Sequence, residues 1–285
     1  MNILNKACNY EFLDCGSTRR LERIGDKIFI RQAPQADFKP LFPELWKTAH
    51  FSYDKDASPV WSGSSEGAPI PDFQYRTLKM EMRLSENGQI GIYPEQKDNW
   101  DWLYDHLSAD RSPQRIFNGF AYTGASSLVC ASAAAQAEVC HLDASKSAVN
   151  WARVNREKSG LPEDAVRFIV DDISVFLERE KRRGNSYSGM ILDPPAFGRA
   201  KGGKTWILKR DLPKLMNLCK DVLDDDPRFF LLSCHDPEFS KQDLAGLTAS
   251  VLGVGESDIE TLDLTLPSEK GNPMPNGIAA RWYKC

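Results

Sequence analysis

The feature that most constrains the fold is a regular alternation of predicted strands and helices, which begins near Asp98 and continues toward the C-terminus. Strands are predicted over residues 115–118, 138–142, 166–170, 187–192 and 228–232, and helices over residues 124–135, 145–158, 173–183, 209–223 and 242–252. Two closing strands are predicted over residues 259–264 and 277–282. Strict β–α alternation predicts an α/β fold with a mostly parallel sheet and helices on both faces.

The first part of the chain has a different texture and predicts a small, mostly β domain over residues 1–94, with the α/β domain over residues 95–285. Residues 75–84 alternate between apolar and polar side chains, and a turn at residues 86–88 follows, so residues 75–93 are predicted to form a hairpin. Residues 54–72 are rich in proline, glycine and serine, which indicates a surface loop.

Composition excludes several classes of protein. Thirty-six basic and forty acidic side chains give a net charge of −4, which argues against a surface that binds nucleic acid all over. No run approaches the ~18 apolar residues of a membrane span, and the start lacks the pattern of a secretory signal. The seven cysteines include no C-x-x-C pair and the four histidines are scattered, so we expect neither disulfides nor a metal site. A reduced cytoplasm is the expected location.

The first strand of the α/β part leads into the turn Asn118-Gly119-Phe120-Ala121-Tyr122-Thr123-Gly124. Open α/β sheets bind ligands beyond the carboxyl ends of their strands, so this turn is a candidate site. It is not G-x-G-x-x-G and has no lysine for a phosphate, which argues against a dinucleotide or a nucleoside triphosphate. An ordinary strand-to-helix turn is the alternative.

Acidic residues follow the next two strands. Asp143 lies twenty-four residues after Gly119, a spacing that suits hydrogen bonds to ribose hydroxyls. Asp171 and Asp172 follow the third strand and are candidates to bind the exocyclic amine of adenine. All three carboxylates also suit the N-terminus of the helix that comes next.

The fourth and fifth strands end in the two most reactive candidates. Asp193 is followed by Pro194 and Pro195, which stiffen the backbone and suit a site that must hold an acceptor group in fixed geometry. Cys234 is either a buried packing residue or a nucleophile whose pKa is lowered by the neighbouring His235.

A basic segment follows the prolines. Residues 199–210 hold five basic groups and no acid, namely Arg199, Lys201, Lys204, Lys209 and Arg210. Cations beside the aromatic rings of Phe197 and Trp206 form a pattern that suits phosphates and a stacked RNA base. Gly202 and Gly203 indicate a mobile loop, and a solvated surface loop is the alternative.

Together these segments resemble the class I S-adenosylmethionine-dependent methyltransferases, and in particular the bacterial enzymes that modify cytosine C5 or guanine N7 of large-subunit ribosomal RNA. The residues that carry the resemblance are NGFAYTG at 118–124, LDASK at 142–146, VDD at 170–172, LDPPAFG at 192–198 and GIYPEQ at 91–96. The resemblance implies a Rossmann-like sheet of seven strands with the last antiparallel, and S-adenosyl-L-methionine as cofactor.

The resemblance also implies residue roles. The methionine moiety of the cofactor would lie against Phe120, Tyr122, Thr123 and Gly124, the ribose against Asp143 and Ala144, the adenine against Asp172 and Ile173, and the sulfonium near Asp193. The candidate substrate-binding residues are Pro194, Phe197, Lys201, Lys204 and Trp206. The cofactor is a cation without phosphate, so acids without a phosphate-binding lysine suit it better than they suit a nicotinamide dinucleotide.

The predicted activity is methyl transfer to a base of RNA. If the product is 5-methylcytosine, Cys234 would attack C6 of the base and Asp193 would assist proton handling. Three alternatives are a methyltransferase acting on a small molecule or a protein, a nicotinamide-dependent oxidoreductase, and a catalytically silent cofactor-binding module. The sequence leaves the oligomeric state open.

Overall fold

The computed structural model describes residues 8–55, 58–63, 69–199, 205–269 and 271–284, which form two compact units. The first unit comprises the N-terminal segment up to Gln96 together with two later segments, Lys158–Gly160 and Thr265–Pro275. The second unit comprises Lys97–Glu157, Leu161–Leu264 and the chain from Asn276 onward. The sequence analysis predicted two continuous domains, 1–94 and 95–285, whereas the first unit also includes these two later segments.

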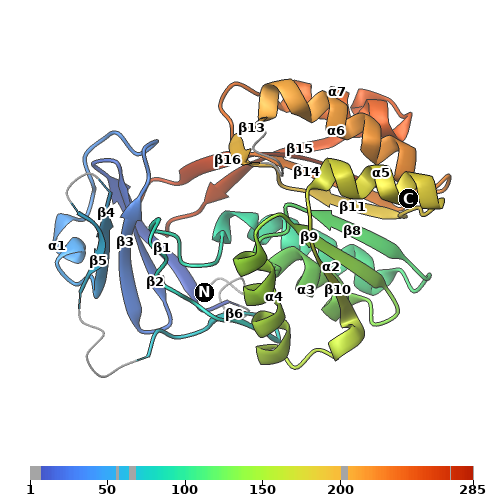
Figure 1. Ribbon diagram of the computed structural model, residues 1–285. Helices are drawn as coiled ribbons and strands as arrows, with labels where there is room; N and C mark the ends of the chain where they lie inside the picture. Colours follow the sequence, from blue (N-terminus) through green and yellow to red (C-terminus); the bar gives the residue numbers. More distant parts are fainter. Residues whose placement is uncertain (1–7, 56–57, 64–68, 200–204, 270, 285) are drawn as a thin grey trace. The chain divides into compact units, whose positions relative to one another are not determined.

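A seven-stranded sheet forms the centre of the second unit (Figure 1). Its strands, in spatial order, are β10 (Val166–Val170), β9 (Glu138–Asp143), β8 (Arg115–Gly119), β11 (Gly189–Leu192), β14 (Phe229–Cys234), β16 (Met274–Tyr283) and β15 (Glu260–Leu266). The first five are parallel to one another, and β16 is antiparallel to β14. The predicted seven-stranded, mostly parallel sheet is therefore confirmed.

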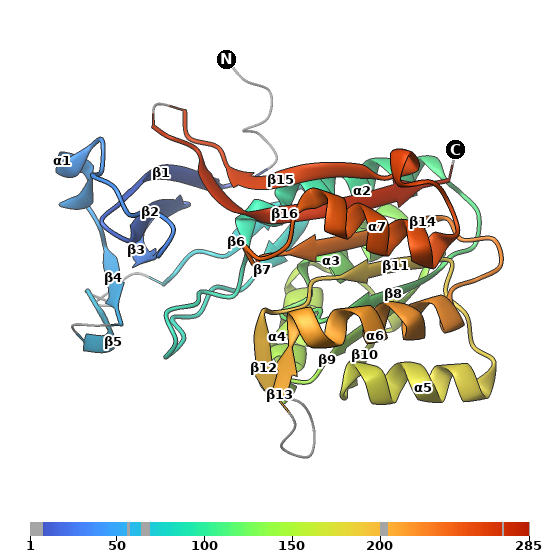
Figure 2. The ribbon, with the colours of Figure 1, turned by 90° about the horizontal axis from the view of Figure 1, so that it is seen from above.

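Helices cover both faces of this sheet, as predicted (Figures 1 and 2). One face carries α2 (Lys97–Ala109), α3 (Ala125–Ala133) and α4 (Lys146–Lys158), and the other carries α5 (Ile173–Arg183), α6 (Leu208–Val222) and α7 (Lys241–Leu252). Short 3-10 helices lie at η2 (Pro94–Gln96), η3 (Glu163–Ala165) and η5 (Glu256–Asp258). No helix in the described ranges is long and apolar enough to cross a membrane.

Local chemistry explains where these elements begin and end. The carboxylate of Asp172 accepts hydrogen bonds from the backbone N–H groups of Ser174 and Val175 and so caps α5, and Gly184 ends that helix in the left-handed conformation. The buried rings of Phe117 and Phe176 stack at 5.5 Å between centroids, which joins the sheet to α5.

The first unit is mostly β, as predicted. Its sheet runs in the order β1 (Tyr10–Gly16), β2 (Arg19–Ile24), β3 (Lys27–Gln32), β4 (Phe51–Asp54) and β5 (Ser58–Ser62). A short helix, α1 (Pro43–Trp46), and a two-stranded sheet of β6 (Phe73–Tyr75) and β7 (Leu78–Met80) complete the unit. Phe12, Ala36 and Leu266 belong to one of its buried clusters.

The structure differs locally from several predictions. The predicted hairpin over residues 75–93 forms only around its turn, where the N–H groups of Arg83 and Ser85 donate to the carbonyls of Ile90 and Gln89, and the paired strands are instead β6–β7, in which Tyr75 faces Leu78. Strand β5 lies within the predicted surface loop at residues 54–72. Strands β12 (Phe197–Arg199) and β13 (Thr205–Ile207) pair antiparallel, which was not predicted, while Gly202 and Gly203, on which the predicted mobile loop rests, lie outside the described residues.

Candidate active site at the carboxyl edge of the sheet

The candidate site lies where the parallel strands end. Strand β8 lies between β9 and β11, so the chain runs outward from β8 first in one direction and then in the other. Such a reversal of strand order is where open α/β sheets bind ligands. The loops after β8, β9 and β10 touch one another: the N–H of Ala121 donates to the Leu142 carbonyl at 3.1 Å, and the N–H of Asp171 donates to the Asp143 carbonyl at 3.2 Å.

The turn after β8 has an unusual backbone. Phe120, Tyr122 and Gly124 have positive φ angles of 58°, 47° and 94°, so the chain passes three times through the left-handed region. Non-glycine residues adopt this conformation only where the surroundings hold them in it, and such sites cluster where ligands bind. A Cβ atom on Gly124 would lie 3.0 Å from the Cβ of Ala152, so α3 and α4 leave no room for a side chain there. Thr123 is buried in this turn.

Asp143 ties this turn to β9. Its Oδ2 accepts a hydrogen bond from the Tyr122 N–H at 2.9 Å, and its Oδ1 accepts one from the Ser145 N–H at 2.8 Å. Burial raises the pKa of this carboxyl, and the two backbone donors only partly offset that effect. A cationic ligand would favour the charged form of Asp143, so the group fits a sulfonium nucleoside. Ala144, next in the chain, is exposed.

The acids after β10 have mixed roles. Asp171 is buried and forms an ion pair with Arg179, and Asp172 caps α5. The capping alternative for Asp172 is therefore what the structure shows directly. Ile173 is buried, and its Cδ1 lies 2.5 Å from where a Cβ on Gly119 would be. The absence of a side chain at Gly119 thus makes room for Ile173.

Asp193 follows β11, and its neighbour Pro194 is buried. The Oδ1 of Asp193 lies 3.1 Å from Nε2 of His235, which follows β14. The Nδ1 of His235 lies 2.5 Å from the backbone carbonyl of Asn276. Sequence reasoning considered His235 only as a neighbour of Cys234, and nothing local indicates a contact with a residue 42 positions away.

Cys234 is placed differently from what the sequence suggested. Its side chain is 1% exposed and its thiol donates to the Asp236 carbonyl at 3.8 Å. Burial is the main cause that raises the pKa of the thiol to about 11. The expected lowering of this pKa by His235 is wrong, because the imidazole is directed to Asp193 and Asn276.

The pair β12–β13 carries the aromatic candidates. Phe197 is 71% exposed, whereas Trp206 is 9% exposed. The Trp206 indole N–H donates to the Pro195 carbonyl at 2.7 Å, and its ring packs against Phe120 at 5.3 Å between centroids. Trp206 therefore supports the proline corner and is not available to stack on a base, which corrects its predicted role.

The basic segment is partly neutralised. Lys209 pairs with Glu238 at 2.8 Å, and Arg210 pairs with Asp211 at 2.7 Å, so these cations do not stand alone as the sequence suggested. Lys201 and Lys204 lie outside the described residues.

A buried polar group behind the turn was missed by sequence reasoning. The amide of Asn118 donates to Ser127 Oγ at 2.8 Å, which lies 3.0 Å from Nδ1 of His141. Burial lowers the pKa of His141 to about 3, so the ring is neutral at physiological pH. The sequence signal was available, since polar residues at positions 118 and 141 interrupt two strands that are otherwise buried.

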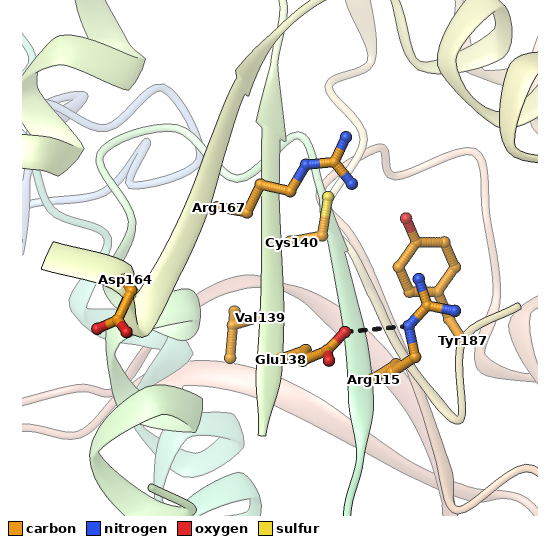
Figure 3. A pocket seen from close by; sticks show the side chains of 7 residues that line it. All are labelled: Arg115, Glu138, Val139, Cys140, Asp164, Arg167 and Tyr187. Carbon is orange, nitrogen blue, oxygen red and sulfur yellow. Dashed lines mark ion pairs between the residues drawn. The ribbon is translucent and has the colours of Figure 1, made fainter. Parts of the chain in front are cut away.

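A separate cavity of 210 Å³ opens at the opposite, amino edge of the sheet (Figure 3). Figure 3 shows Arg115 beside Tyr187, and Arg115 Nε lies 3.2 Å from Glu138 Oε2. Arg167 supplies a second guanidinium. Two guanidinium groups disfavour a sulfonium cation, so this cavity does not suit the cofactor that the carboxyl edge suits. Nowhere in the described ranges do three or more potential metal-ligating side chains gather.

Comparisons with known proteins agree with this geometry. The solved structure of an S-adenosylmethionine-dependent methyltransferase from Agrobacterium tumefaciens matches with a TM-score of 0.89 and 28% identity, covering 96% of this chain and 90% of that one. A methyltransferase solved in complex with S-adenosylhomocysteine matches with a TM-score of 0.75 over 98% of this chain and 76% of that one. Its 15% identity supports the fold alone.

Among curated proteins, the ribosomal RNA large subunit methyltransferase I of Aeromonas salmonicida is 28% identical over 147 residues. The match spans 52% of this chain and 36% of that relative, so it covers little more than a third of the relative's length. A family model described as S-adenosylmethionine-dependent methyltransferase matches residues 47–250. The family match covers more than half of the chain and agrees with the fold, so the chain belongs to the S-adenosylmethionine-dependent methyltransferase family.

Proposed function

We propose that this protein transfers a methyl group from S-adenosylmethionine to a base of RNA, with ribosomal RNA as the substrate. The observation that carries the proposal is the proximity in sequence of Asp193, Pro194 and the exposed Phe197 at the carboxyl edge. The large-subunit ribosomal RNA methyltransferase activity in the name of the curated relatives supports the choice of substrate. Such a substrate would place the reaction in the cytoplasm.

The cofactor would be held by the loops after β8, β9 and β10. The turn from Phe120 to Gly124 would border its methionine moiety, Asp143 and Ala144 its ribose, and Asp172 and Ile173 its adenine. Because the Asp172 carboxylate already caps α5, we assign the adenine contact to the backbone of Asp172 and Ile173 as well as to side chains. When bound, the cofactor supplies an electrophilic methyl group on a sulfonium.

The chain's own residues would orient the acceptor. Asp193 accepts a hydrogen bond from an N–H of the base, and the stiff Pro194–Pro195 segment keeps that carboxylate in position. Phe197 stacks on the extruded base, which every base permits because each has a π face. Trp206 fixes the proline corner through its bond to the Pro195 carbonyl. We propose that the reaction uses no covalent bond to Cys234, since its thiol is buried and protonated.

The test is transfer of tritiated methyl from S-adenosylmethionine to RNA, protein and small-molecule fractions of a strain that lacks the gene. We expect label in ribosomal RNA with the wild-type protein and none with Asp193→Ala. Label in the protein or small-molecule fraction alone would replace RNA with another substrate class. Absence of label in all fractions would indicate a silent cofactor-binding module and contradict the proposal.

A further inference from the structure

We propose that His235 is a positioning residue for methyl transfer, which holds the Asp193 carboxylate through a shared proton. This inference rests on the proposed function, because it assigns a role to a residue beside Asp193, the residue placed at the acceptor.

The imidazole is contacted on both sides, by the Asp193 carboxylate at Nε2 and by the Asn276 backbone carbonyl at Nδ1. Strands β11 and β14 are parallel neighbours with Leu192 opposite Leu232, so Asp193 and His235 leave the sheet side by side. On the other flank, β16 pairs with β14 and brings the Asn276 carbonyl to 2.5 Å from Nδ1 of His235.

Gly277 is part of this arrangement. Its φ is +147°, and a Cβ there would lie 2.5 Å from the Cys234 carbonyl oxygen and 2.9 Å from Nδ1 of His235. A side chain at position 277 would therefore displace the imidazole. The strand opposite His235 is thus shaped to let the ring approach it.

The hydrogen-bond partners of the His235 imidazole indicate how many protons the His235–Asp193 pair holds. A backbone carbonyl oxygen can only accept, so Nδ1 of His235 carries a hydrogen. Nε2 then faces Oδ1 of Asp193 at 3.1 Å, and two lone pairs at that distance would repel one another. We infer that one proton lies between Nε2 and Oδ1, and the His235–Asp193 pair has zero net charge while that proton is present.

Other titratable groups belong to the loop that follows β14. They are Asp236 and Glu238, and Glu238 pairs with Lys209 of α6 at 2.8 Å. The buried Cys234 thiol precedes His235 in the chain. The Oδ1 of Asp193 contacts the imidazole directly, at 3.1 Å from Nε2.

The hydrogen bond between His235 and Asp193 has a consequence for catalysis. An ionised carboxylate has about four acceptor positions, so one bond from His235 leaves capacity for a substrate N–H. A hydrogen bond to one oxygen restricts rotation of the Asp193 carboxyl group. A displacement of the reacting groups by about 1 Å can lower the rate by about 100-fold. We expect the rate to fall as pH rises and the shared proton is lost.

The decisive experiment compares wild type, His235→Gln and His235→Ala across pH 6 to 9, with ribosomal RNA as substrate and tritiated S-adenosylmethionine as donor. Glutamine donates to Asp193 at every pH, so we expect it to retain much of kcat and to lose the alkaline decline. Alanine should lower kcat by about 100-fold at unchanged affinity for S-adenosylhomocysteine. A wild-type profile that is retained in both variants would overturn the inference.

A second measurement is independent of RNA. Long-range ¹H–¹⁵N spectra resolve the four histidines, and His235→Gln identifies the signal of His235. We expect the ring to keep both protons to a higher pH in wild type than in Asp193→Asn. Identical titration of His235 in the two proteins would overturn the inference while leaving the methyltransferase activity in place, whereas failure of tritium transfer by wild type would overturn the proposed function itself.

Discussion

Asp143 accepts backbone hydrogen bonds from Tyr122 and Ser145, so its side chain shapes the turn after β8. Burial raises the pKa of its carboxyl, and we propose that a bound cationic nucleoside favours the charged form.

Substitution of Asp143 by alanine should weaken binding of S-adenosylhomocysteine. Hydrogen bonds to a charged group contribute about 1.5–3 kcal/mol, so the loss is about 10- to 150-fold in Kd. Titration calorimetry measures it. Asp164→Ala, an exposed acid at the opposite edge, is the matched control and should bind as wild type does. Equal affinity of both variants would remove Asp143 from the cofactor site.

Cys234→Ser should retain methyl transfer. The wild-type thiol is buried, with its pKa raised to about 11, so a thiolate is scarce at neutral pH. Serine is close in volume and keeps a donor for the Asp236 carbonyl, so we expect kcat within about threefold of wild type. The check is tritium transfer together with trapping on RNA containing 5-fluorocytidine. A covalent protein–RNA adduct, or loss of activity in Cys234→Ser with cofactor binding intact, would show that the thiol is the nucleophile.

The strand pair β12–β13 changes the predicted roles of two aromatic residues. Its pairing joins Phe197 to Ile207 and orients Phe197 outward and Trp206 inward. Phe197 is thereby exposed, as its proposed contact with the substrate requires, and Trp206 donates a hydrogen bond to the Pro195 carbonyl.

Phe197→Ala should reduce RNA affinity without affecting cofactor binding or stability. Stacking of a base on an aromatic ring contributes about 1–3 kcal/mol, which corresponds to about 5- to 150-fold in KM or Kd. Filter binding and kinetics on ribosomal RNA measure the change. Val175→Ala on α5, which is also partly exposed, should leave RNA binding unchanged. Equal losses in the two variants would mean that Phe197 makes no specific contact.

The elements that sequence analysis predicted best are those fixed by local chemistry. Strand β10 and helix α5 begin and end where predicted, because Asp172 supplies a cap and Gly184 a left-handed end within a few residues. Two features were missed for different reasons. Strands β12 and β13 are only three residues long each and pair with one another a few residues apart, so they are too short to show a strand pattern. The bond between His235 and Asp193 joins residues 42 positions apart, so no local pattern marks it.

The same distinction holds for the site. The acids and glycines of the carboxyl edge could be found, because alternation fixes which end of each strand they follow. The contacts that these residues make could not be predicted. Gly119 makes room for Ile173, and Lys209 of α6 forms an ion pair with Glu238 of the loop after β14.

In the whole molecule, the first of the two units contains a buried cluster of charged side chains. Glu22 is fully buried and receives two hydrogen bonds from Arg31, one of 2.6 Å and one of 2.9 Å, and Arg20 lies 3.3 Å from it. Burial raises the pKa of Glu22, but the two guanidinium groups outweigh that effect and lower it to about 2.

Glu22→Gln should destabilise the protein by about 3–5 kcal/mol at pH 7, because it removes the carboxylate that pairs with both buried guanidinium groups. The carboxyl has a folded pKa below its usual value of 4.5, so its contribution is present above that value and is lost as pH falls toward about 2. Urea unfolding at pH 7 and pH 3 should show the difference between variant and wild type shrinking at pH 3.

Glu11→Gln is the matched control on the neighbouring strand. Glu11 pairs with Arg23 at 2.7 Å, but both side chains are more than a third exposed, so the expected loss is below about 1 kcal/mol. Similar losses for the two variants would contradict the importance assigned to burial.

The central claim is that the carboxyl edge of the seven-stranded sheet holds the cofactor. A crystal structure of the protein with S-adenosylhomocysteine tests it most directly. We predict the nucleoside against the Phe120–Gly124 turn and Asp143, with its sulfur toward Asp193. A ligand seated at the opposite edge beside Arg115 and Arg167 would contradict the claim.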